Sequence, residues 1–214
     1  MNVPRPIPPP VPPPHGGSLR RELARKALHL SSATIPIAYA LGAPRRPLLV
    51  LLVSLLGVAL VVEGARRASP VAGGWFLRTF GPLLRPRERA GMVGATWMLL
   101  AYTGAVWLTP APVAIAATWA VAGGDASAAI IGRAMAGRAG GAPADGRKTW
   151  WGSAGCAAVA AAGAYVLAGL SPATALAVGL VAAGAERPAG PGDDNLRITL
   201  AVCALLMLAR AISA

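Results

Sequence analysis

The residues best suited to chemistry lie in one stretch in the second half of the chain. Asp125 stands inside an apolar segment, where an ionisable side chain is costly and is usually buried and functional. A glycine-rich basic loop follows it and ends at Arg147, Lys148 and Thr149. Glycines let backbone N–H groups approach phosphate oxygens, and cations neutralise those oxygens. The stretch suits a nucleotide site, and it equally suits a helix-packing aspartate beside an ordinary positive loop.

Three further carboxylates, Glu186, Asp193 and Asp194, follow one of the last apolar segments. Carboxylates combined with phosphate oxygens suit Mg²⁺. With the basic run at 147–148, they favour phosphoryl or nucleotidyl transfer at a membrane surface, which needs no covalent enzyme intermediate. A phosphate-loop motif does not fit, because one residue too many precedes Lys148 and no strand comes before it.

Basic residues also flank the earlier apolar segments. Arg25, Lys26 and His29 fall on neighbouring faces of a helix where the first segment begins. They form either a positive membrane anchor or a phosphate or headgroup site, in which His29 handles a proton near neutral pH. Arg85 and Glu88 lie in a long arginine-rich connection, as part of a site or as solvated loop residues.

The composition indicates an integral membrane protein. The 214-residue chain has a mean hydropathy of +0.57 and only 13% charged residues. Its formal net charge is +12, with the basic residues placed between apolar segments, which suits membrane topology and anionic headgroups rather than nucleic acid. Cys156 and Cys203 both lie in apolar segments and are expected to be packing residues.

Apolar periodicity predicts an all-α, polytopic membrane bundle of about seven transmembrane helices. Residues 1–17 form a proline-rich tail that we expect to be disordered, and 18–214 form a single membrane domain. Several segments are near the minimum of about 17 residues for a span. Glu63, at the end of the second segment, is expected to mark the membrane interface. The expected segments are 27–41, 47–62, 92–108, 113–131, 152–170, 173–185 and 196–212.

The distribution of arginine and lysine predicts the orientation. The N-terminal flank and the loops 64–91 and 132–151 are basic, whereas the turns 109–112 and 170–172 carry no cation. Cytoplasmic loops are enriched in Lys and Arg, so we expect a cytoplasmic N-terminus in the cell (inner) membrane. Every candidate residue then faces the cytoplasm.

Four motifs occur in order from about Arg20 to Ile212. They are Arg25-Lys26-x-x-His29; Phe80 to Glu88 with Gly94-Ala95-Thr96; Asp125-x-x-Ala128-x-x-x-Gly132 with Arg147-Lys148-Thr149-x-x-Gly152; and Glu186 with Asp194-Asn195. Together they resemble the CTP-dependent polyprenol and lipid kinase family, which includes dolichol kinase, phytol kinase and fungal CTP-dependent diacylglycerol kinase. Three departures from the family pattern are Trp151, where an acidic residue is usual, Gly137, one residue later than expected, and Arg147, where the first lysine of a pair is usual.

The resemblance implies a membrane kinase that uses CTP and Mg²⁺ to phosphorylate an isoprenoid alcohol or related lipid. His29 is then the general base, and Asp125 with Glu186 or Asp194 holds Mg²⁺. The implied catalytic residues are His29, Asp125, Lys148 and Asp194; the implied nucleotide-binding residues are Asp125, Gly132, Gly137, Arg147, Lys148, Thr149 and Gly152; the implied phosphate or headgroup residues are Arg25, Lys26 and Arg85.

Two alternatives stay open. A membrane cytidylyltransferase that makes CDP-lipid from phosphatidate has a similar Asp…Gly…Lys-Lys-Thr stretch, but usually has Ser-Pro before the lysines, where this chain has Ala144-Asp145-Gly146. A non-catalytic membrane protein or transporter could share the scaffold, and Trp151 supports this reading. The acceptor lipid and the oligomeric state are not predicted by the sequence.

Overall fold

The computed structural model describes residues 27, 29–138, 148–187 and 193–213. The described chain is all-helical and contains no strand, as the sequence predicts. The proline-rich tail 1–17 lies outside the described residues, as do Arg25, Lys26 and Arg147. The helices are α2 (Thr34–Ala40), α3 (Arg45–Ala68), α4 (Pro70–Phe80), η1 (Gly81–Leu83), α5 (Pro86–Ala90), α6 (Gly94–Leu108), α7 (Ala111–Trp119), η2 (Ala120–Asp125), α8 (Ala126–Arg138), α9 (Trp150–Val166), α10 (Pro172–Glu186) and α11 (Asp194–Ser213).

Three helical stretches in the described chain are long and apolar enough to cross a membrane. They are α3, the continuous stretch Ala111–Met135 and α11. Helices α6, α9 and α10 are apolar but have only 15, 17 and 15 residues, at or below the usual length of a span. Membrane association therefore follows from length and composition.

The first predicted segment, 27–41, is not one regular helix in the described chain. Helical residues at 29–31 give way to a turn, and α2 has only seven residues. The Ser32 hydroxyl donates to the His29 carbonyl at 2.6 Å and lies 3.1 Å from the Tyr102 hydroxyl. Such side-chain bonds compete with helical backbone bonds. The break leaves His29 on its own short turn beside the bundle.

The stretch Ala111–Met135 is the central element of the fold, because 67% of its apolar 18-residue window is buried, against 17% of the corresponding window of α3. Its alanines from 114 to 120 are fully or almost fully buried, and they pack close to α9. Small residues of this kind allow helix backbones to approach closely in membranes. Gly163 of α9, for example, leaves no room for a Cβ beside the Trp119 ring.

The middle of this central element is a π-helical turn, Ala120–Asp125. Such turns widen the helix and are frequent at functional sites. The turn contains Gly123 and Gly124, and the latter approaches the Cys156 sulfur so closely that an added Cβ would lie 3.2 Å from it. The widened turn ends at Asp125, which is buried.

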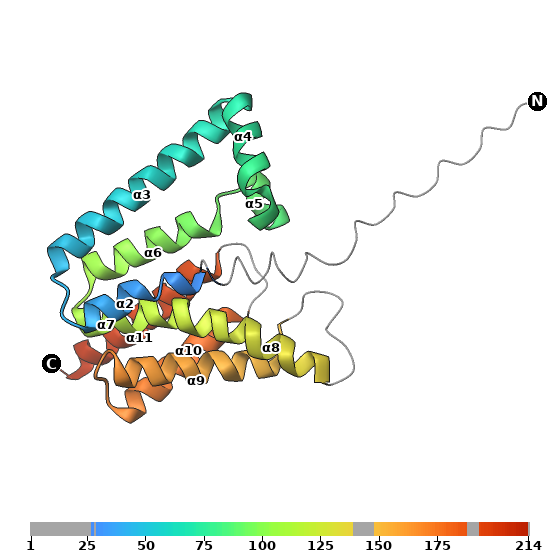
Figure 1. Ribbon diagram of the computed structural model, residues 1–214. Helices are drawn as coiled ribbons and strands as arrows, with labels where there is room; N and C mark the ends of the chain where they lie inside the picture. Colours follow the sequence, from blue (N-terminus) through green and yellow to red (C-terminus); the bar gives the residue numbers. More distant parts are fainter. Residues whose placement is uncertain (1–26, 28, 139–147, 188–192, 214) are drawn as a thin grey trace, which may run out of the picture.

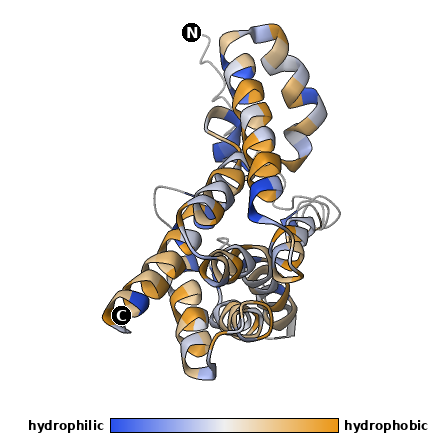
Figure 2. Ribbon diagram, turned by 90° about the vertical axis from the view of Figure 1, so that its left-hand side faces the viewer, coloured by the Kyte–Doolittle hydropathy of each residue, from blue (hydrophilic) through white to orange (hydrophobic). Residues whose placement is uncertain are grey.

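Helices α3, α4, α5 and α6 form a second group above this bundle (Figure 1). Much of α3 is apolar and exposed: Val50, Val58 and Val61 are each more than 60% accessible. Figure 2 shows helices that are mostly orange or pale, with few blue residues. Exposed apolar surface of this extent marks an interaction surface, and for a helix long enough to span it suits lipid contact.

Glu63 does not mark an interface, contrary to the expectation from sequence, because its side chain is buried. Its carboxylate pairs with Arg66 at 2.7 Å and Arg67 at 3.0 Å, and accepts from the Val93 N–H at 2.7 Å. Arg66 in turn donates to the carbonyls of Arg89 and Gly91. A buried carboxylate needs such partners, and here they join the end of α3 to the start of α6.

Candidate functional site

A cavity of about 510 Å³ lies between the α3–α6 group and the bundle. One part of its lining is apolar and aromatic, and the other part is charged. Its volume is in the ordinary range of small-molecule sites. The apolar lining is Ala59, Val62, Trp75, Phe76, Phe80, Leu83, Leu84, Val93, Gly94, Ala95 and Met98; the polar lining is His29, Glu63, Arg85, Glu88, Thr96, Asp125, Asp193, Asp194 and Asn195.

The polar lining is rich in carboxylates. Five of the eight acidic residues in the sequence line this one cavity, although the whole chain has a formal net charge of +12. Among the described residues that line the cavity, Arg85 is the one arginine or lysine. Acidic side chains are therefore concentrated at this cavity of an otherwise basic chain.

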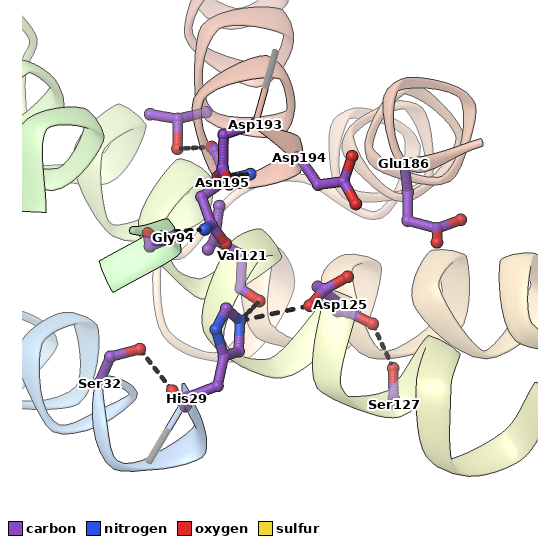
Figure 3. Close-up of polar contacts among 12 residues, drawn as sticks. His29, Ser32, Gly94, Val121, Asp125, Ser127, Glu186, Asp193, Asp194 and Asn195 are labelled. Carbon is purple, nitrogen blue, oxygen red and sulfur yellow. Dashed lines mark hydrogen bonds and ion pairs between the residues drawn. The ribbon is translucent and has the colours of Figure 1, made fainter. Parts of the chain in front are cut away.

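His29 and Asp125 meet at this polar end, although 96 positions separate them in the sequence (Figure 3). His29 Nε2 lies 3.5 Å from Asp125 Oδ2 and 3.1 Å from the Val121 carbonyl oxygen. Both partners belong to the π-helical turn. A carboxylate that accepts from one ring nitrogen fixes the tautomer of the imidazole, which directs a lone pair to the other nitrogen.

Lys148 forms a second charged cluster with two carboxylates beside the cavity. Its Nζ lies 2.9 Å from Glu186 Oε1 and 3.1 Å from Asp194 Oδ2, and it also donates to the Glu186 carbonyl. Arg197 binds the other oxygen of Asp194. Asp194 also lines the cavity, so it connects this cluster to the His29–Asp125 pair. The second oxygen of Glu186, Oε2, is buried and has no hydrogen-bond partner within the described part of the chain.

The N-termini of α11 and α6 meet at the same place. Asp193 accepts from the Asn195 N–H at 2.9 Å, and the Asn195 side-chain amide donates to the Gly94 carbonyl at 3.2 Å. Glu88 accepts from the N–H groups of Arg85 at 2.8 Å and Gly94 at 3.3 Å. Burial raises the pKa of Asp193, and neighbouring Asp194 adds to this, against the opposing effects of the Asn195 bond and Arg85.

The predicted nucleotide-binding residues Gly132, Thr149 and Gly152 have packing roles. The Thr149 hydroxyl caps α9 by accepting from the Gly152 N–H at 3.0 Å. A Cβ on Gly152 would lie 2.7 Å from the Ala128 carbonyl oxygen, and one on Gly132 would lie 2.8 Å from the Thr149 hydroxyl. Gly137 lies in the last turn of α8. These contacts explain the glycines by helix packing; contact with phosphate stays a prediction.

Gly152→Ala should therefore destabilise the fold whatever the ligand. We expect a cost of about 1–3 kcal/mol, because the added methyl meets backbone rather than a movable side chain. Thermal melting of the purified protein in lipid would measure this. Gly104→Ala on α6 is the matched control: no atom lies within 4 Å of its added Cβ, so the melting temperature should stay equal or rise. Unchanged melting of the Gly152 variant would contradict the packing role.

The three predicted Mg²⁺ ligands, Asp125, Glu186 and Asp194, do not form a preformed metal site. No group of three or more His, Cys, Asp or Glu side chains is placed to hold an ion among the described residues. Lys148 occupies the space between Glu186 and Asp194 instead. Glu186 Oε2, which no described residue contacts by a hydrogen bond, leaves one oxygen for a cation. A single oxygen suits an ion that arrives with phosphate oxygens better than a resident ion.

The structure thus brings together most of the described residues that the sequence singles out. His29, Arg85, Asp125 and Asp194 line the cavity. Lys148 and Glu186 adjoin it through Asp194. Trp151 is not among the lining residues and is more than half exposed.

The sequence did not identify Glu63 as a site residue, nor the aromatic wall of α4, which consists of Trp75, Phe76 and Phe80. The two arginines three and four residues after Glu63 were an available signal, since that spacing places ion pairs on one helix face. Phe76 and Phe80, also four apart, share a face of α4 in the same way. In an interfacial helix such a pair is equally expected to face lipid. The sequence therefore does not distinguish contact with lipid from lining of a cavity.

Comparison of the chain with family models, curated proteins and solved structures finds no match. The fold and the cavity define an all-helical protein with helices able to cross a membrane and a charged, apolar-walled site at their ends. Function is therefore argued from the site itself.

Proposed function

We propose that this chain is a membrane kinase that transfers a phosphoryl group from a nucleotide, CTP by resemblance, to the hydroxyl of an isoprenoid alcohol or related lipid. One observation carries the proposal: residues 29, 125 and 194 converge at the charged end of a cavity whose other walls are apolar. An amphiphile fits such a cavity with its hydroxyl among the charged groups and its chain against the aromatic wall.

In this proposal His29 accepts the proton of the acceptor hydroxyl. Asp125 positions the imidazole through Nε2, which lies 3.5 Å from its Oδ2, and we assign the proton of the hydroxyl to the opposite ring nitrogen. The hydroxyl oxygen then forms a bond to the terminal phosphorus of the nucleotide, and the bond to the leaving diphosphate breaks. The products are a lipid phosphate and a nucleoside diphosphate, with the proton on His29.

Lys148 neutralises phosphate charge in this scheme, after exchanging a carboxylate partner for a phosphate oxygen. Arg147 and the glycines 132, 137 and 152 contribute to the nucleotide site as the resemblance implies. Asp125, Glu186 or Asp194 would supply a carboxylate oxygen to Mg²⁺ that accompanies the nucleotide, and the ion would neutralise phosphate charge. The proposed topology has about seven spans, a cytoplasmic N-terminus and the site facing the cytoplasm.

The decisive experiment supplies the purified full chain in lipid with Mg²⁺ and γ-labelled CTP, and with farnesol, geranylgeraniol, phytol, a long polyprenol or diacylglycerol. We expect label in a lipid phosphate. Omission of the alcohol is the control, and label must then disappear. Release of pyrophosphate with phosphatidate would identify a cytidylyltransferase instead. Absence of both label transfer and CTP binding would support the non-enzymatic reading.

A further inference from the structure

His29 is attached to the rest of the molecule by its backbone as well as by its ring. Its carbonyl oxygen accepts from the Ser32 N–H at 3.1 Å and from the Ser32 hydroxyl at 2.6 Å. The same hydroxyl lies 3.1 Å from the hydroxyl of Tyr102 on α6, 70 positions away in the sequence. Tyr102 in turn donates to the Thr118 carbonyl of α7 at 2.9 Å. Two hydroxyl groups therefore link the His29 backbone to the central element of the fold.

The two hydroxyls of this link depend on each other. Each hydroxyl carries one proton, whereas the carbonyls of His29 and Thr118 at the two ends of the link can only accept. Two protons thus serve three contacts, and removal of either hydroxyl changes the bonding of the other. Tyr102 is only 1% exposed, so bulk water does not readily replace a partner that it loses.

The ring of His29 contacts the same helical stretch further along. Its Nε2 lies 3.1 Å from the Val121 carbonyl oxygen and 3.5 Å from Asp125 Oδ2 (Figure 3). Thr118, Val121 and Asp125 follow one another at intervals of three and four, the spacing that places residues on one side of a helix. Because the Val121 carbonyl only accepts, Nε2 carries the hydrogen in this contact. Backbone and ring of His29 are therefore both held to the central element.

We infer that Tyr102 and Ser32 are positioning residues for His29, which fix its backbone so that its ring keeps Nε2 at Val121 and Asp125. Neither hydroxyl residue is among the described residues that line the cavity, so both act through His29. The catalytic consequence rests on the proposed function, whereas the placement of the ring is measurable without nucleotide or lipid substrate. A misplacement of about 1 Å in an active site can cost about 10²-fold in rate.

Solid-state NMR of the full chain in lipid bilayers, with ¹⁵N-labelled histidine, tests the placement. The sequence contains two histidines, so His15→Gln leaves His29 as the one source of ring signals. At a pH high enough for a neutral imidazole, the nitrogen shifts distinguish the two tautomers. We expect a single tautomer with hydrogen on Nε2, and a mixture of both tautomers when Tyr102→Phe or Ser32→Ala is added.

Thr103→Val is the matched control for the loss of a buried hydroxyl from α6. Thr103 is the buried neighbour of Tyr102, and its hydroxyl donates at 2.7 Å to the Leu99 carbonyl of the same helix, away from His29. Its ring signals should match the wild type. Ser32→Thr keeps a hydroxyl and should restore the single tautomer. If Tyr102→Phe does not fold, Ser32→Ala and Ser32→Thr form the test, because Ser32 lies in a partly exposed turn.

In the phosphorylation assay Tyr102→Phe and Ser32→Ala should each lower kcat by about 10–100-fold, with little change in KM for the nucleotide. The double variant should be no slower than the slower single variant, because coupled residues are not additive. A single Nε2–H tautomer in both variants would overturn the inference, as would losses that multiply. If the tautomers mix as expected but the wild type phosphorylates no lipid, the kinase proposal fails and the positioning of His29 stands.

Discussion

Asp125→Asn and His29→Gln are each expected to lower kcat for lipid phosphorylation by about 10²–10⁴-fold, the usual contribution of general acid–base catalysis. The two side chains form one unit, with His29 Nε2 at 3.5 Å from Asp125 Oδ2. Loss of either partner removes a correctly oriented base. The double variant should therefore be no slower than the worse single variant, because residues that act as a unit are not additive.

A steady-state assay with labelled CTP and geranylgeraniol would measure these rates. Ser127→Ala is a suitable control, because the Ser127 hydroxyl bonds the carbonyls of Gly124 and Gly155 near the same turn and does not line the cavity. Its kcat should remain near wild type. Losses that multiply in the double variant would show that Asp125 acts independently of His29, for instance on the nucleotide, and would refute the paired role.

The sequence predicted those candidate-site residues whose charge is energetically costly in an apolar segment. Asp125 stands in an apolar segment, so burial and function were expected of it, and the structure shows it buried at the cavity. Glu186 and Asp194 were predicted as site residues because they lie beside the ends of apolar segments. Their shared partner Lys148 lies at least 38 positions away, and the packing of α9 against α10, and of α10 against α11, brings it there.

The helices were predicted more reliably than the break and the π-helical turn that interrupt them. Six of the seven expected apolar segments are helical. Their ends lie within four residues of the expected ones, except that α3 ends six residues later and α8 seven residues later. The π-helical turn at Ala120–Asp125 has no local sequence signature, since alanine and glycine fit many backbones. The break at Ser32 depends on a contact with Tyr102, 70 positions away, so it is a tertiary effect that local periodicity does not contain.

Glu63 shows that local sequence also fails to predict the burial of a charged side chain. A glutamate at the end of an apolar segment is ordinarily an interfacial residue, and nothing local contradicts that reading. Its burial results from the turn at 91–93, whose backbone N–H at Val93 binds the carboxylate. Because the connection 64–91 folds back as α4 and α5, the residue becomes internal.

Lys148→Met is expected to reduce both stability and phosphoryl transfer. It leaves the buried carboxylate of Glu186 beside Asp194 without their shared cation. Removing one partner of a buried pair costs about 3–5 kcal/mol, and the 28% exposure of the Lys148 side chain lowers this to roughly 2–4 kcal/mol. For a chain of this size we expect the melting temperature to fall by roughly 4–16 °C. Transfer should fall by about 10²–10³-fold, as for other lost contacts to transition-state charge.

The double variant Lys148→Met with Glu186→Gln separates the two effects. The neutral amide introduced at position 186 no longer needs the cation, so most of the melting temperature should return, whereas phosphoryl transfer should stay low because no ammonium reaches the phosphate. Lys148→Arg keeps a cation at the position and should retain more transfer than either methionine variant. Recovery of transfer in the double variant would mean that Lys148 only compensates buried carboxylates. Its charge would then serve the fold, and the phosphate would have to be held by other cations.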